Sequence, residues 1–585
     1  MSQRPASRPA PATAPVVSQA QAAPPAWLRW VILALAALAL MAMFSGEMGD
    51  ADTWIHLRTG QWMWENHKLP IPDPFAWTTY LGKPVYPEEA ATRDLNLKHE
   101  WLGQVIVYLV YAAGGFPGMV LFRALCVAGF CAIVGWVVYG RTREFYPAIA
   151  AAFLAATLAR HIAVDRPFVI TYLLLALTLA ILERRRWLWL LPPIFVFWAN
   201  VHGGFFMGWV LLGAYCGEAL IQRLRQQPPA DERTLWAVSI VSILASGLNP
   251  AFFGVIPGML AYRQSFMQNT LREWHPPALF APSWFSALLL GAAVVMLWAR
   301  PRVRPADWLM YLVFAILSLM ALRNIIFIGL IAPVVIFSYL PSYQRLVKPA
   351  TEYAIALLLG IGIIAKVASG SAFQFHVADW KFPKGAVRFL HDHNISAPMF
   401  NLYEWGGYLM WAAWPQEKTF VDGRALNESV FRDYLRIALN FRDAQELLDK
   451  YGVQVILLEG FEYSRGTVYM LGAALSDPAQ TRWKLVFQDK AAMLFMRQPP
   501  PGVQSLDPRE VFASLEAQCR EYVQHVPQQP RCARGLGDLY ARLGDLNQSR
   551  QWLEFYMSRN TDPDPDIDRL YQQIRSGTFH APPQR

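Results

Sequence analysis

Residues 27–57 read WLRWVILALAALALMAMFSGEMGDADTWIHL, and this stretch holds both features that decide the fold. Trp27–Phe44 is apolar and close to the length that crosses about 30 Å of hydrocarbon as a helix. The dense polar motif Asp50-Ala51-Asp52-Thr53-Trp54-Ile55-His56-Leu57 follows shortly after it. A cleaved signal peptide has a shorter apolar run and a small-residue cleavage site, so we interpret Trp27–Phe44 as an uncleaved first span.

Apolar segments alternate with short polar connectors from there to about residue 368. The chain has 585 residues, of which 54% are hydrophobic and 16% charged, a balance typical of a polytopic α-helical membrane protein with a soluble portion. Arg residues lie mainly in the connectors, so the net charge of +9 indicates topology rather than nucleic-acid binding. Together with 27–44, about 11 spans are expected, the others at roughly 118–139, 145–160, 167–183, 187–200, 204–222, 234–249, 284–299, 307–321, 324–340 and 351–368.

The connectors fall into two chemical sets that predict the orientation of the spans. Every second connector is basic, and the others carry mixed Asp, His, Asn, Arg and Trp motifs. Lys and Arg near span ends resist translocation, so the basic set should face the cytoplasm and the mixed set the outside. The basic connectors are Arg141–Arg143, Arg184–Arg186, Arg223–Arg233, Arg300–Arg304 and Arg345–Lys348.

Residues 101–139 decide this orientation, because a second full crossing there would place the mixed motifs in the cytoplasm. Trp101–Ala113 is short and ends in Gly114-Gly115-Phe116-Pro117-Gly118. Irregular backbone at membrane depth is tolerated where protein or water lines it. We therefore expect 101–139 to make one net crossing with a re-entrant or half-span portion.

Four regions are expected along the chain: a disordered cytoplasmic tail, a transmembrane domain, an extracytoplasmic α/β domain and a helical tail. Their bounds are 1–26, 27–369 with a first external loop over 45–100, 370–500 and 501–585. In the third region we expect strands at Met399–Asn401, Thr419–Asp422, Val453–Glu459, Lys484–Gln488 and Met493–Met496, and helices at Lys384–His391 and Arg442–Tyr451.

The helical tail is expected to be TPR-like. Leu536-Gly537-Asp538-Leu539-Tyr540, followed by Gly544-Asp545, matches the start of a tetratricopeptide repeat. With one convincing repeat, we expect a helical hairpin that packs on the α/β domain; the alternative is a docking site for a protein partner. Cys519 and Cys532 lie on the oxidising side, which allows a disulfide, and no Cys pair has zinc-site spacing.

The first external loop holds the strongest candidates for chemistry. Asp50, Asp52 and His56 follow the first span, and His99 and Glu100 close the loop. A carboxylate at the membrane surface can act as a general base toward a hydroxyl, and Asp52 and Glu100 are the candidate catalytic residues. A carboxylate pair could instead hold a divalent cation, although the sequence leaves the need for a metal unknown. In a purely structural alternative, Asp50 caps a helix that begins near Asp52.

Further external connectors carry candidates for anion and substrate binding. Arg160 and Arg166 lie in the motif 160–167, where Arg166 suits a phosphate and Asp165 is its alternative, structural partner. Arg323 lies between two apolar runs, so an anionic partner is expected there too. Candidate substrate-binding residues are Asn200 and His202 before a Gly pair, and His275, besides Asp50, His56 and His99.

The motif Asp52-Thr-Trp-Ile-His-Leu-Arg-Thr-Gly60, with Pro72-Asp-Pro-Phe75 and His99-Glu-Trp-Leu102, resembles bacterial members of the GT-C superfamily of integral-membrane glycosyltransferases. That superfamily includes the protein O-mannosyltransferases and the lipid A aminoarabinose transferases. Thr53 follows Asp52 where the mannosyltransferases carry an acidic pair. The resemblance covers about residues 28–500, and its other motifs are Arg166-Pro167, Asn200-Val-His-Gly-Gly204, Asn401-Leu-Tyr-Glu-Trp-Gly-Gly-Tyr408 and Phe420-Val-Asp-Gly-Arg424.

This resemblance implies a multi-pass protein of the bacterial inner (cytoplasmic) membrane, with its C-terminal domain outside, that uses polyprenyl-phosphate-linked sugars. The expected function is sugar transfer from such a donor to a glycan, lipid or protein acceptor at the external face. Asp422 and Arg424 would touch the acceptor or, alternatively, form an internal pair at a turn. Two other function classes stay open: a transporter or flippase of a polar lipid-linked substrate, and a non-catalytic scaffold in envelope polysaccharide assembly.

Overall fold

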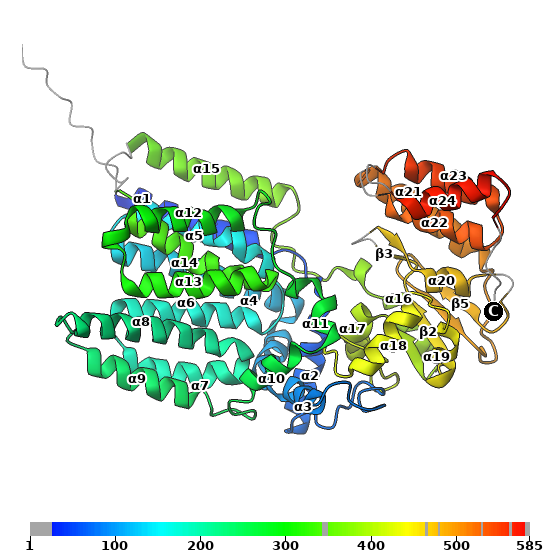
Figure 1. The fold of residues 1–585 in the computed structure, drawn as a ribbon, viewed down its shortest axis with the longest axis horizontal. Coiled ribbons are helices and arrows are strands. Elements are labelled where there is room, and N and C mark those ends of the chain that lie inside the picture. The colour runs from blue at the N-terminus through cyan, green and yellow to red at the C-terminus, as the bar shows by residue number, and fades with distance from the viewer. Residues whose placement is uncertain are drawn as a thin grey trace, which may run out of the picture.

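The computed structural model describes residues 26–341, 349–462, 466–477, 480–527, 530–560 and 564–579, so the tail expected at 1–26 lies outside the described residues except for Ala26. A helical bundle occupies one end of the long axis and an α/β part with the C-terminal helices the other (Figure 1). The bundle consists of α1 (Ala26–Phe44), α4 (Trp101–Thr142), α5 (Phe145–Ala159), α6 (Phe168–Arg184), α7 (Leu191–Val201), α8 (Phe206–Leu224), α9 (Glu232–Ala245), α12 (Trp284–Trp298), α13 (Pro305–Met320), α14 (Ile326–Tyr339) and α15 (Pro349–Ala368).

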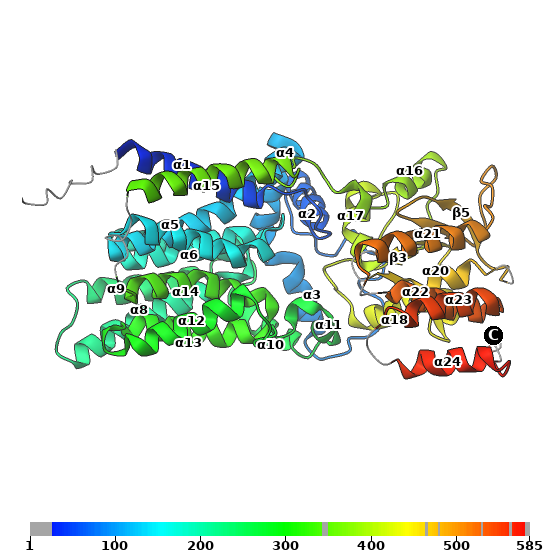
Figure 2. The same ribbon diagram turned by 90° about the horizontal axis from the view of Figure 1, so that it is seen from above.

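The bundle is that of a multi-pass membrane protein, and its helices run along the long axis of the molecule (Figure 2). A helix is present in every interval where a span is expected. Six of the described helices are long and apolar enough to cross a membrane by length and composition, and further apolar helices are shorter. The total of about 11 spans therefore stays a prediction.

Helix α4 begins at Trp101 and contains the irregular segment expected between 101 and 139. Its backbone leaves helical geometry at Gly115, with φ 59° and ψ −155°, and Pro117 follows. Proline removes a backbone donor and clashes with the preceding turn, which explains a break at this point. The two halves of α4 can therefore take different directions within one element.

Small residues let the helices of the bundle approach closely. Helix α5 buries alanines toward its neighbours, among them Ala148, Ala151 and Ala155. A Cβ built on Gly135 of α4 would lie 2.6 Å from the Ala148 carbonyl oxygen, so only glycine fits this crossing. Packing of small residues is a main source of helix association where no hydrophobic drive exists between helices in lipid.

Between the bundle and the α/β part lie short helices from two connectors that are expected to be external (Figures 1 and 2). The first connector supplies α2 (Thr53–Asn66) and α3 (Glu89–Lys98). The second supplies α10 (Val255–Tyr262) and α11 (Phe266–Thr270).

The α/β part is built around a four-stranded sheet in the order β1-β2-β6-β5. β1 (Met399–Asn401) is parallel to β2 (Val455–Leu458), which is antiparallel to β6 (Met493–Met496), and β6 is antiparallel to β5 (Lys484–Gln488). A separate antiparallel pair joins β3 (Phe461–Glu462) and β4 (Thr467–Val468). The helices of this part are α16 (Lys384–Asp392), α17 (Gly406–Ala412), α18 (Glu428–Ala438), α19 (Ala444–Lys450) and α20 (Met470–Leu475).

One expected strand is wrong. Thr419–Asp422 forms a single isolated bridge, between Thr419 and Ala76 of the first external loop. The backbone N–H of Phe420 donates to the side-chain oxygen of Asn401 in β1, 2.7 Å away, and not to a backbone carbonyl of the sheet. This segment therefore joins the α/β part to the loop instead of extending the sheet.

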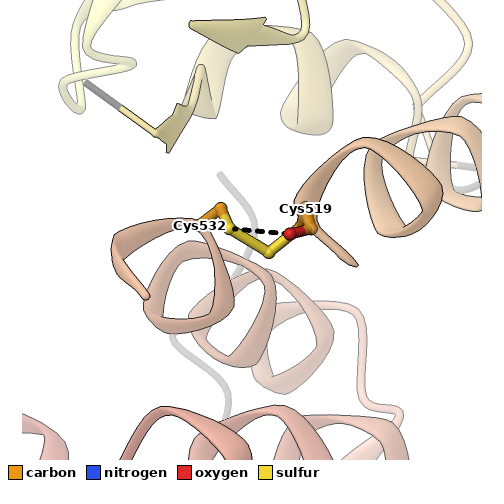
Figure 3. Close-up of a disulfide and its surroundings, with 2 residues drawn as sticks. All are labelled: Cys519 and Cys532. Carbon is orange, nitrogen blue, oxygen red and sulfur yellow. Dashed lines mark hydrogen bonds between the residues drawn. A yellow bond between two sulfur atoms is a disulfide. The ribbon is translucent and has the colours of Figure 1, made fainter. Parts of the chain in front are cut away.

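The C-terminal helices α21 (Arg509–His525), α22 (Arg531–Arg542), α23 (Leu546–Met557) and α24 (Pro565–Arg575) lie beside the sheet (Figure 1). α22 and α23 form the hairpin expected from the repeat motif, with Gly544 at positive φ in the turn. α22 contacts β4 and α20 of the α/β part. A disulfide joins Cys519 of α21 to Cys532 of α22 (Figure 3).

Backbone bonds join the first external loop to the α/β part along its length. Met48 N–H donates to the His376 carbonyl, and Ala378 N–H donates to the Met48 carbonyl. Further along, Trp77 N–H donates to the Thr419 carbonyl. Because backbone groups away from water need partners, the loop and the α/β part satisfy each other and form one unit.

Candidate functional site

An Arg with two carboxylates lies where the first external loop meets the bundle. Arg166 Nε and Nη2 donate to the two oxygens of Asp50, at 2.8 and 2.9 Å. Arg166 Nη1 lies 2.7 Å from Asp52 Oδ2. Asp50 and Asp52 are close in sequence and follow α1, whereas Arg166 is distant in sequence and comes just before α6. The fold brings the start of α6 to the end of α1. The structure therefore brings together three of the predicted site residues.

The Asp52 carboxylate does not cap the helix that follows it. Asp52 is the residue before α2, yet its side chain makes no capping hydrogen bond. Asp50 Oδ1 accepts from the Asp52 backbone N–H at 2.9 Å. The Asp52 side chain stays 26% exposed, so an acceptor molecule can reach it.

Gly423 of the α/β part closes one side of Asp52. A Cβ built on Gly423 would lie 2.0 Å from Asp52 Oδ1, so any side chain there would displace the carboxylate. Burial raises the pKa of Asp52 to about 6, against the lowering effect of Arg166. A carboxylate with a pKa near the working pH is suited to accept a proton.

Glu100, the second candidate base, lies among three histidines. His99 Nε2 is 2.8 Å from Glu100 Oε1. His202 Nε2 and His56 Nδ1 each lie 3.8 Å from a Glu100 oxygen. The carboxylate is thus surrounded by ring nitrogens and differs from Asp52, which keeps one oxygen without a cation.

His202 and Asn200 differ in what they offer a ligand. His202 Nδ1 accepts from the Gly204 backbone N–H and lies 3.0 Å from Thr171 Oγ1. Asn200 uses its amide within the protein: its oxygen accepts from Trp101 Nε1 at 2.7 Å, and its nitrogen donates to the carbonyls of Val196 and Leu248. The structure therefore gives Asn200 a role in joining α4, α7 and the end of α9.

Arg323 and His275 lie in connectors beside these clusters. Arg323 Nη1 is 3.3 Å from Glu273 Oε1, and its guanidinium stacks on Trp274. The backbone N–H of Leu322 donates to the His275 carbonyl, which links the two connectors. The charge of Arg323 acts on His202, and that of Glu273 acts on Asp52, so this segment borders the site. Arg160, by contrast, is exposed and forms no ion pair within the described part of the chain.

Asp422 and Arg424 form a buried ion pair that also includes Asp73. Arg424 Nε donates to Asp422 Oδ1 at 2.8 Å, and Nη1 donates to Asp73 Oδ1 at 2.8 Å. The side chains are at most 8% exposed. Burial would raise the pKa of Asp422, but Arg424 holds it below its usual value. The internal pair expected as an alternative is present, and it spans the first external loop and the α/β part.

A small groove lined in part by Arg166 lies at the break in α4. Its empty volume, which includes space open to solvent, is about 240 Å³, and its apolar walls come from Val107 and Val110 before the break and from Met119 and Phe122 after it. Arg166, Arg123 and Asp165 also line it. The groove therefore has both apolar and charged side chains in its walls.

Arg123 is the partner of Asp165, an interaction that the sequence did not predict. Arg123 Nη1 lies 2.5 Å from Asp165 Oδ2, and Nε donates to the Phe44 carbonyl at the end of α1. Asp165 is thus not the partner of Arg166 that the structural alternative proposed. An Arg inside an apolar span is a signal for such a partner, since buried charges are paired.

A divalent cation stays a prediction for this site. Both carboxylates of the first loop direct oxygens at Arg166, whose charge takes the place that a cation would take. No group of three or more His, Cys, Asp or Glu side chains is arranged to hold a metal ion among the residues that the structure describes.

The fold is similar to that of an archaeal oligosaccharyltransferase. Archaeal oligosaccharyltransferase AglB from Archaeoglobus fulgidus, solved with an inhibitory peptide and a dolichol-phosphate, aligns with a TM-score of 0.51 and 11% identity over 91% of this chain and 86% of that chain. ArnT from Cupriavidus metallidurans, at 12% identity over 81% of this chain and 98% of that chain, gives TM-scores of 0.47 in the apo state and 0.45 bound to undecaprenyl phosphate.

The likeness to AglB concerns the fold, and it confirms the expected GT-C-like architecture of a helical membrane domain with a smaller α/β part. No protein-family model matches the chain, and no curated protein matches it by sequence.

Proposed function

We propose that the chain is a glycosyltransferase that moves a sugar from a polyprenyl-phosphate donor to a glycan, lipid or protein acceptor at the external membrane face. The observation that carries this proposal is the Asp52 carboxylate, which is reachable, is bound by Arg166 through one oxygen and has the other oxygen free of cations. The shared fold adds support, because AglB was solved with a dolichol-phosphate.

Asp52 acts as the general base in this proposal. The acceptor hydroxyl oxygen forms a bond to the anomeric carbon while the bond from that carbon to the phosphate oxygen breaks. The electron pair of the broken bond leaves with the polyprenyl phosphate, and the hydroxyl proton passes to Asp52. General base catalysis of this kind contributes roughly 10²–10⁴ in rate.

The donor phosphate lies at Arg166 in this proposal, and its polyprenyl chain enters the bundle beside the groove at the break of α4. Arg166 uses three N–H groups on Asp50 and Asp52, and a guanidinium has five, so two remain for phosphate oxygens. The positive charge of the guanidinium beside the phosphate stabilises the leaving group as the bond breaks.

Arg323, which pairs with Glu273, is the second proposed phosphate ligand. Asp50 and Asp52 together carry more charge than Arg166 neutralises. Tyr172 of α6 lies within electrostatic range of Arg166, Arg323 and Glu273, so the two arginines belong to one region of the molecule. Arg160, exposed and without an ion pair in the described residues, has the weakest support as a phosphate ligand.

The remaining roles are proposals of the same kind. Glu100 orients the acceptor, because the histidines around it leave it poorly placed as a base.

The membrane is the bacterial inner membrane, with the α/β part and the C-terminal helices outside. A protein partner would dock on those C-terminal helices.

Native mass spectrometry of the detergent-extracted protein tests donor binding. The wild type is compared with Arg166→Ala and with Arg143→Ala, a control at the opposite end of α4. We expect a polyprenyl phosphate or its sugar-charged form on the wild type and the control, and none on Arg166→Ala. Equal retention by all three proteins would contradict the placement of the phosphate.

A further inference from the structure

The three histidines around Glu100 are not equivalent, because hydrogen bonds fix two of them. His99 Nδ1 lies 3.0 Å from the Leu95 carbonyl oxygen, which can only accept, so this nitrogen carries a proton. His99 Nε2 faces the Glu100 carboxylate at 2.8 Å and donates as well. Both nitrogens of His99 are therefore donors, and the ring is an imidazolium paired with Glu100.

His202 is fixed in the other way. Its Nδ1 accepts from the Gly204 backbone N–H, so its proton is on Nε2, which faces Glu100. Trp198 Nε1 donates to Thr171 Oγ1, which leaves the Thr171 proton for the same Nδ1. Neither nitrogen of His202 can accept from a ligand.

His56 alone keeps a nitrogen for a ligand. Neither of its ring nitrogens makes a hydrogen bond within the described residues, and Nδ1 is the buried one. Nδ1 lies 3.8 Å from Glu100 Oε2, beyond hydrogen-bond distance, so the nearby negative charge favours the tautomer with its proton on Nδ1. In the neutral ring this leaves a lone pair on Nε2, and the His56 side chain is 12% exposed. Burial lowers the pKa of His56 to about 4, so the ring is neutral at physiological pH.

His56 also lies close to the proposed base. Its backbone N–H donates to the Asp52 carbonyl at 3.2 Å, so it lies one helical turn after Asp52. Residues four apart lie on the same side of a helix. The charges of Arg166 and Asp50 both act on His56, which places the ring beside the carboxylate cluster.

We propose that His56 binds the acceptor: its Nε2 accepts a hydrogen bond from an acceptor hydroxyl and holds the acceptor against Asp52, while Glu100 orients the ring from behind. This inference rests on the proposed function. It gives Glu100 a positioning role that acts through His56, in the way that a buried carboxylate orients a histidine in hydrolases. The ligand is a polyol, such as a sugar, presented from the external side.

The test compares sugar transfer with donor hydrolysis in protein reconstituted in nanodiscs. The donors are undecaprenyl phosphates linked to radiolabelled mannose, glucose, galactose or arabinose, and the acceptor probes are octyl mannoside and octyl galactoside. The variants are His56→Ala and His56→Gln, because the Gln amide oxygen can replace Nε2 as an acceptor. His67→Asn is the control, since His67 is an exposed residue at the end of the same helix.

Loss of one hydrogen bond to the acceptor should raise its KM about tenfold in His56→Ala. We expect the KM of the donor and the rate of donor hydrolysis to change less than about twofold, and His56→Gln to recover most of the acceptor affinity. Equal losses of transfer and hydrolysis, or an unchanged acceptor KM, would overturn the inference. No transfer by the wild type with any donor would contradict the proposed function itself, and this inference with it.

Discussion

At the scale of single residues, Asp52 is partly exposed, yet its surroundings change the pKa of its carboxyl group. Burial raises its pKa from 3.8 to about 6, so the folded protein holds this proton more tightly than the unfolded chain does. From this group alone, folding becomes less favourable as pH rises between those two values. A site residue that disfavours the fold in its active, ionised form is easier to explain by function than by stability.

This environment predicts the pH dependence of transfer. The base must be ionised, so kcat/KM should be constant above pH about 6 and should fall about tenfold per pH unit below it. The measurement is kcat/KM from pH 4.5 to 8 in nanodiscs, with thermal stability followed over the same range. A rate that stays level down to pH 5 in folded protein would exclude Asp52 as the base.

Arg424 shows the opposite case, a charged residue whose role is stability. Its replacement in Arg424→Met leaves the buried carboxylates of Asp73 and Asp422 without a cation. Breaking a buried pair in this way costs about 3–5 kcal/mol of unfolding free energy. The control is Arg482→Met, which removes an exposed pair with Asp449 and should cost at most about 1 kcal/mol.

Denaturant unfolding of the purified protein measures both variants. Equal free energies of unfolding of Arg424→Met and Arg482→Met would show that Arg424 does not stabilise the fold. Arg424 would then again be a candidate for acceptor binding.

The residue types of the site could be predicted from sequence, but their partners could not. Clustered Asp, His, Glu and Arg at external span ends indicate Asp52, Glu100 and Arg166 directly. The joining of Asp73 to Arg424, or of Arg123 to Asp165, depends on which segments meet in space. Asn200 is a further example: the sequence does not reveal that its side-chain amide is hydrogen-bonded within the protein to Trp101 and Leu248.

At the scale of elements, the turn that carries Gly423 controls how closely the α/β part approaches α2. The Cβ of Gly423→Ala would lie 2.0 Å from Asp52 Oδ1, so the carboxylate or the turn must move. A displacement of about 1 Å in a catalytic group can reduce the rate about 10²-fold. We therefore expect Gly423→Ala to lose most of its transfer activity.

The control for this change is Gly213→Ala in α8, where a Cβ meets nothing within 4 Å. Circular dichroism and thermal unfolding should show both variants folded, with Gly423→Ala destabilised by about 1–3 kcal/mol at most. Full activity in Gly423→Ala would mean that Asp52 tolerates the shift and that its position is not critical.

Element types followed from sequence wherever periodicity was strong. Strands β1, β5 and β6 lie where alternation and apolar runs predict them. The segment Thr419–Asp422 has the same apolar character, but its hydrogen bonds go to the first external loop and to the Asn401 side chain, which no local pattern reveals. The break in α4 at Gly115 was predictable because glycine and proline interrupt an apolar run.

At the scale of the whole molecule, the first external loop and the α/β part form one unit at one end of the bundle (Figure 2). The first external loop supplies the Asp52 carboxylate, and the α/β part supplies Gly423, which packs against it. The proposed orientation puts this unit outside the cytoplasm, a property that depends on charge distribution and that the fold alone does not fix.

Labelling with a membrane-impermeant maleimide in spheroplasts tests the orientation. Lys418→Cys is exposed in the α/β part and should be labelled in intact cells, whereas Arg225→Cys, exposed after α8, should react only after lysis. Cys126, Cys131 and Cys216 are buried and should not interfere. Labelling of residue 225 alone in intact cells would invert the topology and contradict transfer at the external face.

The most direct measurement of the central claim is the transfer reaction itself, with wild type and Asp52→Asn in nanodiscs. Each protein receives undecaprenyl phosphate linked to a radiolabelled sugar, together with a membrane extract that contains the acceptor glycans and lipids. We expect labelled product from the wild type and a loss of at least about 10² in rate for Asp52→Asn, which removes the base but keeps the shape of the side chain. Transfer at the wild-type rate by Asp52→Asn, in protein that unfolds at the same temperature, would contradict the account.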